Sequence, residues 1–108
     1  MFNLFSGKTK NYKSLNGKEF KHEYDARNHP VLIDVRTAAE FASGSISKAK
    51  NIDLLSLEFK KQIHAMDKSK DYFIFCRSGN RSAQACGIMA ELGFNVYNLK
   101  GGVGMWPR

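Results

Sequence analysis

Short apolar segments alternate with stretches of helical spacing along most of this chain. Val31–Ile33 and Tyr72–Phe75 are the clearest apolar segments, since each is an uninterrupted run of bulky residues without charge. Such runs, bounded by turn residues, predict strands that are buried on both faces, as in a parallel sheet. Three weaker segments complete a predicted sheet of about five strands, and they lie at Tyr12–Leu15, Asn51–Ile52 and Val96–Leu99.

Helical patterns fill the intervals between these strands. Asn16 with Glu19, and Thr37 with Glu40, have the spacing of a capping box, in which side chains satisfy backbone N–H groups at a helix start. The predicted helices run from 16 to the break before Pro30, from 37 to 44, from 56 to 66 and from 82 to 92. Strands that alternate with helices favour an α/β fold, with a central parallel sheet flanked by helices on both faces.

The strand at Tyr72–Phe75 ends at a cysteine, and the candidate chemistry of the chain is concentrated there. The loop that follows contains two arginines, one glycine and no acidic residue, and it reads Cys76-Arg77-Ser78-Gly79-Asn80-Arg81-Ser82. A strand, a tight loop and a helix in that order point backbone N–H groups into the loop. Gly79 allows the loop to turn back, because a residue without a Cβ adopts positive φ without a steric penalty.

These features predict a reactive thiolate at Cys76. The thiolate is the nucleophilic form of cysteine, and loop N–H groups, a helix N-terminus and the charges of Arg77 and Arg81 all favour it over the thiol. The same donors would hold an anionic substrate over the sulfur. The alternative is a purely structural buried cysteine, and the two arginines in so short a loop disfavour it.

Composition and charge limit the classes of function. Residues 12–108 are long enough for a single domain with its own core, and residues 1–11 are predicted to be a flexible leader. The net charge of +7 is dispersed along the chain without a nucleic-acid-binding signature, so nucleic acid is not an expected partner. No apolar run predicts a signal peptide or a membrane partner. Two cysteines without metal-ligand spacing predict no metal, no cofactor and a reducing, cytoplasmic location.

Several short blocks between residues 12 and 106 together resemble the rhodanese, or thiosulfate sulfurtransferase, domain. Four short stretches of the chain resemble the family's first block, and they are Asp34-Val35-Arg36, Glu40-Phe41, Gly44-x-Ile46 and Ala49-x-Asn51-Ile52. Residues 76–82 resemble the family's active-site loop. Its closing block resembles Leu92-Gly93-Phe94, Asn98-Leu99-x-Gly101-Gly102 and Trp106. Each block is short, but their order and spacing together are specific. The resemblance implies an α/β fold with a central parallel sheet and a persulfide formed on Cys76.

Residues outside the loop are predicted to support it. Asp34 and Arg36 end a strand, where catalytic groups often lie in open sheets, but an ion pair that braces the loop, together with Glu40, is the favoured interpretation. Ser82 is expected to cap the following helix, to hydrogen-bond to the sulfur, or both, and Asn80 to contribute its backbone N–H. Ser45 stands where the family usually has a histidine, which we interpret as structural.

The resemblance implies a sulfurtransferase that works by double displacement. The Cys76 thiolate would attack the outer sulfur of an anionic donor such as thiosulfate, release sulfite, and pass the sulfur to a thiol or to cyanide. A carrier that hands persulfide to another protein is an alternative that the residues alone do not separate from such an enzyme. A phosphatase or arsenate reductase of the same fold is disfavoured, because only four residues lie between Cys76 and Arg81 and the loop is too small for a tetrahedral oxyanion. A redox sensor that uses Cys86 as its second thiol is disfavoured by the position of Cys86 inside a predicted helix.

Overall fold

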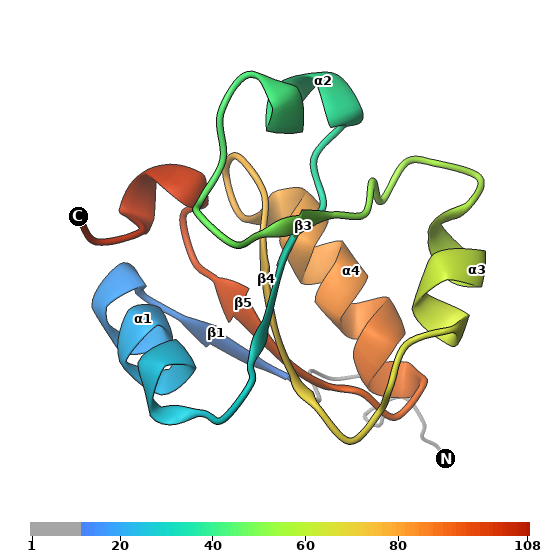
Figure 1. The fold of residues 1–108 in the computed structure, drawn as a ribbon, viewed down its shortest axis with the longest axis horizontal. Helices are drawn as coiled ribbons and strands as arrows, with labels where there is room; N and C mark the ends of the chain where they lie inside the picture. Colours follow the sequence, from blue (N-terminus) through green and yellow to red (C-terminus); the bar gives the residue numbers. More distant parts are fainter. Residues whose placement is uncertain (1–11) are drawn as a thin grey trace, which may run out of the picture.

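A computed structural model describes residues 12–108 as an α/β fold, and the leader predicted at residues 1–11 lies outside the described residues (Figure 1). Five strands form one sheet in the order β1-β5-β4-β2-β3. The pairings between neighbouring strands are all parallel, which confirms the predicted sheet. The strands are β1 (Lys13–Leu15), β2 (Val31–Asp34), β3 (Lys50–Asn51), β4 (Asp71–Phe75) and β5 (Asn95–Leu99).

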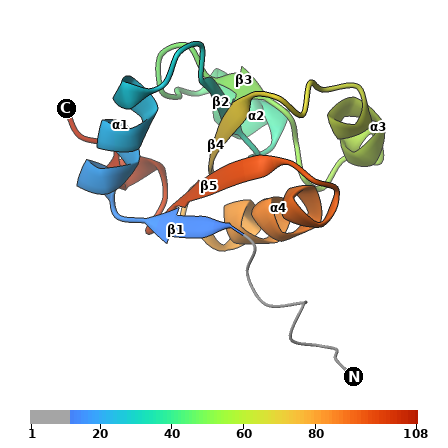
Figure 2. The ribbon, with the colours of Figure 1, turned by 90° about the horizontal axis from the view of Figure 1, so that it is seen from below.

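The helices lie in the predicted intervals, on both faces of the sheet. Figure 2 shows α1 and α4 on opposite sides of β5. The side chains of Asn16 and Thr37 each accept the backbone N–H of a glutamate three residues on, and both glutamates bond back, so the two predicted capping boxes are confirmed. The helices are α1 (Gly17–Ala26), α2 (Ala38–Ala42), α3 (Phe59–His64) and α4 (Asn80–Glu91), with a 3-10 turn η2 (Val103–Met105) after β5.

The central strand β4 divides its side chains between two apolar clusters. Phe73 and Phe75 pack on the α1 side, where the ring centroids of Phe20 and Phe73 lie 5.3 Å apart, edge to face. Ile74 and Cys76 point to the other side, into a cluster shared with α3 and α4. Each fully buried large apolar side chain contributes about 2 kcal/mol to folding, so the alternation along β4 holds this strand firmly in register. The position of Cys76 follows from that register.

The predicted bounds of two helices are wrong. The helix expected over 56–66 is α3, which spans only Phe59–His64, because the side chains of Asp53 and Ser56 accept the backbone N–H groups of Leu55 and Glu58 and hold a turn instead. The helix expected from residue 82 is α4, which begins at Asn80, because Gly79 at φ 98° turns the chain directly into the helix. Leu57, expected on a helical face, is fully exposed.

The carboxyl ends of parallel strands meet at one edge of a sheet, so the segments that follow β2, β3, β4 and β5 converge. Those segments contain α2, the turn before α3, the loop at residues 76–79 and η2. In Figure 1 they lie along the upper part of the molecule, with α2 above the loop that follows β4. This edge is where the loop chemistry predicted from the sequence has to operate.

Candidate active site

Cys76 lies directly after β4, with its sulfur surrounded by hydrogen-bond donors. The N–H of Gly79 donates to the Cys76 Sγ at 3.0 Å, and the N–H of Ser82 donates at 3.4 Å. The Ser82 Oγ lies 3.4 Å from the same sulfur. Cys76 has no solvent-exposed surface, so these donors act in a place that water does not reach. The backbone therefore forms the cradle that the strand, loop and helix order predicts.

Two opposing effects act on the pKa of Cys76, and their net result is a lowered value. Burial disfavours the charged thiolate and raises the pKa. Hydrogen bonds from the Ser82 hydroxyl and from the backbone N–H groups of Ser82, Gly79 and Ser78 stabilise the thiolate and outweigh that burial. For Cys86 in α4, burial raises the pKa far above the ordinary value and the nearby Cys76 charge raises it further. The chain thus has one thiol prepared for nucleophilic chemistry and one that is not.

This difference predicts selective alkylation. The pKa of Cys76 lies below the ordinary cysteine value, so its thiolate persists to lower pH, and only a surface loop has to open to expose it. Cys86 lies within α4 and its pKa is raised, so it stays protonated. Brief treatment of the folded protein with iodoacetamide at pH 7, followed by mass spectrometry, should therefore label Cys76 and leave Cys86 unmodified. Labelling after unfolding in denaturant is the control, where both thiols should react alike. Equal labelling in the folded state would contradict the cradle.

The two loop arginines have different environments, because a glutamate from α2 binds one of them tightly. Glu40 accepts two hydrogen bonds from Arg81, Nη1 to Oε1 at 2.8 Å and Nη2 to Oε2 at 3.2 Å. Arg77 reaches the same carboxylate only through Nε, at 3.4 Å, and its side chain is 69% exposed against 26% for Arg81. The Arg81 pair and the Thr37 capping bonds hold the pKa of Glu40 well below its usual range. Arg81 is therefore neutralised locally, and Arg77 remains the accessible cation.

A buried ion pair braces the chain between β2 and β3. The Arg36 guanidinium donates to the Asp34 carboxylate, with Nη2 to Oδ2 at 2.7 Å, and donates also to the carbonyl of Gly44 at 2.7 Å. The hydroxyl of Ser45 donates to Asp34 at 2.8 Å. The ion pair predicted for Asp34 and Arg36 is present. Glu40 instead bonds to Thr37, Arg81 and Arg77 and makes no hydrogen bond to Arg36. Ser45, at a position interpreted from the sequence as structural, makes its hydrogen bond to the carboxylate of this ion pair.

Comparisons with known proteins show the family of this chain. The family model described as the rhodanese-like domain matches residues 16–108. The chain belongs to the rhodanese-like domain family. The protein YtwF of Bacillus subtilis is 35% identical over 94 residues, which cover 87% of this chain and 89% of the relative. A sulfurtransferase of Allochromatium vinosum is 38% identical over 79 residues, which cover 72% of each chain.

Solved structures show the same fold. A rhodanese-like domain protein from Staphylococcus aureus has a TM-score of 0.76 at 29% identity, and the match covers 88% of this chain and 91% of that one. A rhodanese-related protein from Thermoplasma volcanium has a TM-score of 0.76 at 30% identity, covering 88% and 90%. The resemblance stated from the sequence blocks is therefore confirmed for both the family and the fold.

The loop residues of this rhodanese-like domain have distinct positions. Of the two roles expected for Ser82, the hydrogen bond with the Cys76 sulfur is present, whereas α4 has no side-chain cap. Asn80 is exposed, and the N–H groups that reach the sulfur belong to its neighbours in the loop rather than to Asn80 itself. Arg77 and Ser78 are also exposed and form the outer side of the loop.

Sequence reasoning missed the support beneath the loop. The backbone of Gly102 lies so close that a Cβ on it would overlap the carbonyl group of Arg77 and sit 2.7 Å from the Ser78 nitrogen. The N–H of Val103 donates to the Cys76 carbonyl at 2.8 Å. Asn51 donates through its side-chain amide to the carbonyls of Asp34 and Arg36, both at 2.9 Å. The Gly101-Gly102 pair was the only sign of this support in the sequence, and two adjacent glycines alone predict a turn rather than a contact with the loop.

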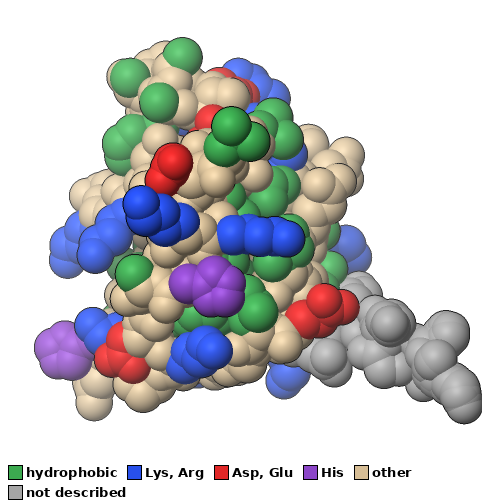
Figure 3. All heavy atoms as spheres, turned by 90° about the vertical axis from the view of Figure 1, so that its right-hand side faces the viewer, with side chains coloured by type: hydrophobic (Ala, Val, Ile, Leu, Met, Phe, Trp, Pro, Cys, Tyr) green, Lys and Arg blue, Asp and Glu red, His purple; other side chains and the backbone are tan. Residues whose placement is uncertain are grey.

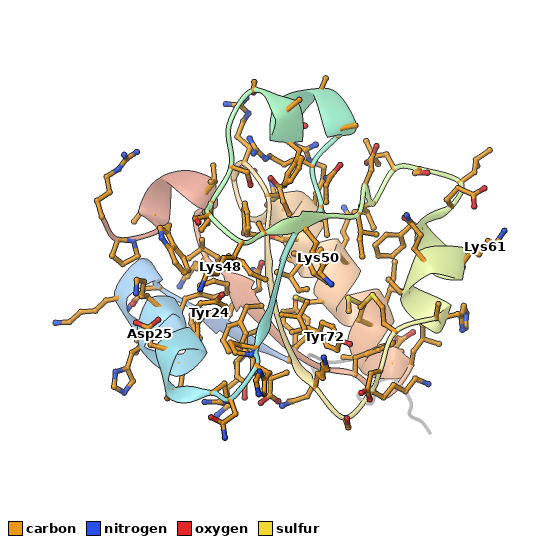
Figure 4. The ribbon with its side chains drawn as sticks, viewed as in Figure 1. Tyr24, Asp25, Lys48, Lys50, Lys61 and Tyr72 are labelled. Carbon is orange, nitrogen blue, oxygen red and sulfur yellow. The ribbon has the colours of Figure 1, made fainter. Side chains whose placement is uncertain are left out.

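Several lysines are exposed on elements outside the loop. Lys48, Lys50 and Lys61 are exposed on the segment before β3, on β3 itself and on α3, where Figure 4 labels them. Within residues 12–108, no group of His, Cys, Asp and Glu side chains is arranged to hold a metal ion. None of the helices in that range combines the length and apolar character needed to cross a membrane.

Proposed function

We propose that this rhodanese-like domain is a sulfurtransferase that carries sulfane sulfur as a persulfide on Cys76. The observation that carries the proposal is the cradle itself, in which the sulfur of Cys76 receives N–H donors at 3.0 and 3.4 Å and has a lowered pKa. Its relative in Allochromatium vinosum is named a sulfurtransferase. A nucleophile that is already ionised requires no general base.

The reaction proceeds in two displacements. The Cys76 thiolate attacks the outer sulfur of thiosulfate, the S–S bond of the donor breaks, and sulfite leaves with the electron pair of that bond. The persulfide that remains on Cys76 is anionic, and the loop N–H groups that stabilised the thiolate are positioned to stabilise it. In the second step a thiolate or cyanide attacks the outer sulfur, and the Cys76 thiolate is regenerated. Two easier steps thus replace one difficult transfer.

Capture of the anionic donor falls mainly to Arg77. Arg81 is held by two hydrogen bonds to Glu40, whereas Arg77 is mostly exposed and has a single contact of 3.4 Å. Because Cys76 is covered in the resting structure, the loop has to open for the donor to reach the sulfur. The Arg77 contact is the weaker of the two, so we expect it to break first and to offer its guanidinium to the donor.

The same pairing disfavours phosphatase chemistry. A phosphatase loop directs an arginine at the oxyanion bound above its cysteine, but here the Arg81 guanidinium is directed at Glu40. A redox sensor is disfavoured because Cys86 is fully buried in the core cluster and its pKa is raised. Both thiols are free in the structure.

Incubation with thiosulfate tests the proposal directly. The protein should gain about 32 Da, one sulfur atom, on Cys76, because covalent catalysis requires that intermediate. Addition of cyanide should remove the mass and release thiocyanate in equal amount. Hydrolysis of an aryl phosphate under the same conditions is the comparison. Faster phosphate release than thiocyanate formation, or no mass gain from thiosulfate, would contradict the sulfurtransferase assignment.

A further inference from the structure

Three large apolar side chains are exposed in residues 12–108, and none of them serves the core. Leu57 is fully exposed, Leu55 is 67% exposed and Met105 is 52% exposed. Single exposed apolar residues are common on protein surfaces, and alone they need no explanation. Here all three lie in segments that follow the carboxyl ends of strands, Leu55 and Leu57 after β3 and Met105 after β5. They therefore share the sheet edge with Cys76.

Contacts place these segments next to the loop. The Met105 side chain packs against Gly101, and the backbone of Gly101 in turn lies against Gly79. On the other side, the Leu54 N–H donates to the Val35 carbonyl at 3.1 Å, which ties the turn that carries Leu55 and Leu57 to the end of β2. The segment that carries Met105 thus lies against the loop, and the turn that carries Leu55 and Leu57 lies at the end of β2, which pairs with β4.

The helix α2 adds a third apolar component above the loop. None of its five residues is buried, and its alanines at 38, 39 and 42 are all exposed. Its one charged residue, Glu40, is directed at Arg81. Figure 3 shows hydrophobic side chains gathered at the upper end of the molecule, over α2 and the neighbouring loop. Beside η2 there is also a hollow of about 510 Å³, which is lined by residues 44–46, 103–104 and 106–108.

We propose that this edge, the apolar rim formed by α2, Leu55, Leu57 and Met105, docks an extended protein segment that presents a cysteine thiol to the Cys76 persulfide. The proposal rests on the proposed sulfurtransferase function and names its acceptor. A small anion gains nothing from apolar side chains, whereas a peptide with apolar residues beside its cysteine buries them here. Arg77, exposed within the rim on a chain of net charge +7, favours an acidic residue in the same segment.

The burial of Cys76 determines the shape of this partner. A flat protein surface does not reach a sulfur with no exposed area, so the acceptor cysteine has to lie on a protruding segment. Its thiolate attacks the outer sulfur of the Cys76 persulfide, the S–S bond to Cys76 breaks, and Cys76 leaves as a thiolate. The acceptor becomes a persulfide, and no external oxidant or reductant takes part.

Two synthetic peptides test the rim. Each has one cysteine and one aspartate, with leucines beside the cysteine in the first and serines there in the second. With thiosulfate-loaded protein, the leucine peptide should accept sulfur about tenfold faster than the serine peptide, because it buries apolar area. The double variant Leu55→Ser/Leu57→Ser should lose that preference and keep the wild-type rate with cyanide. His22→Ser, an exposed change on α1, is the matched control and should behave as wild type.

A binding measurement separates this proposal from the sulfurtransferase assignment. Fluorescence anisotropy with labelled peptides that carry serine in place of cysteine needs no persulfide. The wild type should bind the leucine peptide more tightly than the serine peptide, and the double variant should bind the two equally. Equal binding of the two peptides by the wild type, or a preference unchanged in the double variant, overturns the docking surface. If the wild type self-associates and the double variant does not, the rim binds a second copy of this chain, and that result also overturns the proposed docking of a peptide. A protein that fails to load sulfur but discriminates the peptides contradicts the enzyme proposal and supports the rim.

Discussion

Cys76→Ser is expected to abolish both sulfur uptake from thiosulfate and thiocyanate formation. The serine hydroxyl is not ionised near neutral pH and forms no persulfide, so the covalent intermediate is lost completely rather than weakened. The fold should remain intact, since serine has nearly the volume of cysteine and its oxygen can accept the N–H groups of Gly79 and Ser82. Mass spectrometry of the incubated variant and a colorimetric thiocyanate assay measure the two losses, and circular dichroism checks the fold.

Cys86→Ala is the matched control for that variant. Cys86 is fully buried among apolar side chains, so its removal should leave a small cavity and lower the free energy of unfolding by about 1 kcal/mol. Sulfur uptake should stay at the wild-type level, because Cys86 has no place in the transfer. A Cys76→Ser protein that still forms thiocyanate, or a Cys86→Ala protein that has lost it, would overturn the assignment of the nucleophile.

Gly102→Ala is expected to have a large effect on the loop, although Gly102 lies outside it. Gly102 has φ 89° and ψ −171°, a region that residues with a Cβ almost never adopt, and the added carbon would overlap the Arg77 carbonyl group. The loop would have to move, at a cost to stability of about 3 kcal/mol or more. That movement would separate the Gly79 N–H from the sulfur, raise the pKa of Cys76 and slow its alkylation at pH 7.

Gly104→Ala provides the control for this second prediction. Gly104 lies in η2 close by, but a Cβ there would meet no atom within 4 Å. Its effect on the free energy of unfolding should stay within about 1 kcal/mol, with unchanged alkylation of Cys76. Chemical denaturation and pH-dependent iodoacetamide labelling of both variants measure the two effects. If Gly102→Ala has the same free energy of unfolding and the same alkylation of Cys76 as Gly104→Ala, then Gly102 does not support the loop.

Local patterns in the sequence were enough to predict the cradle and the starts of α1 and α2. The convergence of N–H groups on Cys76 is set by seven consecutive residues at the end of a strand, and each capping box by four. Such features depend on chain order alone, so no tertiary contact has to be known. The alternation along β4, which directs Ile74 and Cys76 to the α4 side, follows in the same way from the strand period.

Contacts between distant segments were not predictable. Glu40 and Arg81 are 41 residues apart, and their pairing depends on where α2 lies over the loop. The sequence predicts that both loop arginines bind the substrate, but Arg81 is already hydrogen-bonded to Glu40, so that role falls mainly to Arg77. The prediction that Leu57 lies on a helix is wrong for another reason. The side chains of Asp53 and Ser56 accept backbone N–H groups and hold a turn where the apolar spacing favoured a helix. Periodicity reports a tendency, and local side-chain competition decides the outcome.

The support under the loop by Gly102 and Val103 has a consequence for the newly made chain. Synthesis proceeds from the N-terminus, so Cys76 emerges from the ribosome before the residues that hold its loop in place. Until Gly102 and Val103 arrive, the Cys76 carbonyl lacks the 2.8 Å bond from Val103, and the sulfur lacks a fixed cradle. We expect the thiol of the nascent chain to keep the ordinary cysteine pKa until the sheet is complete.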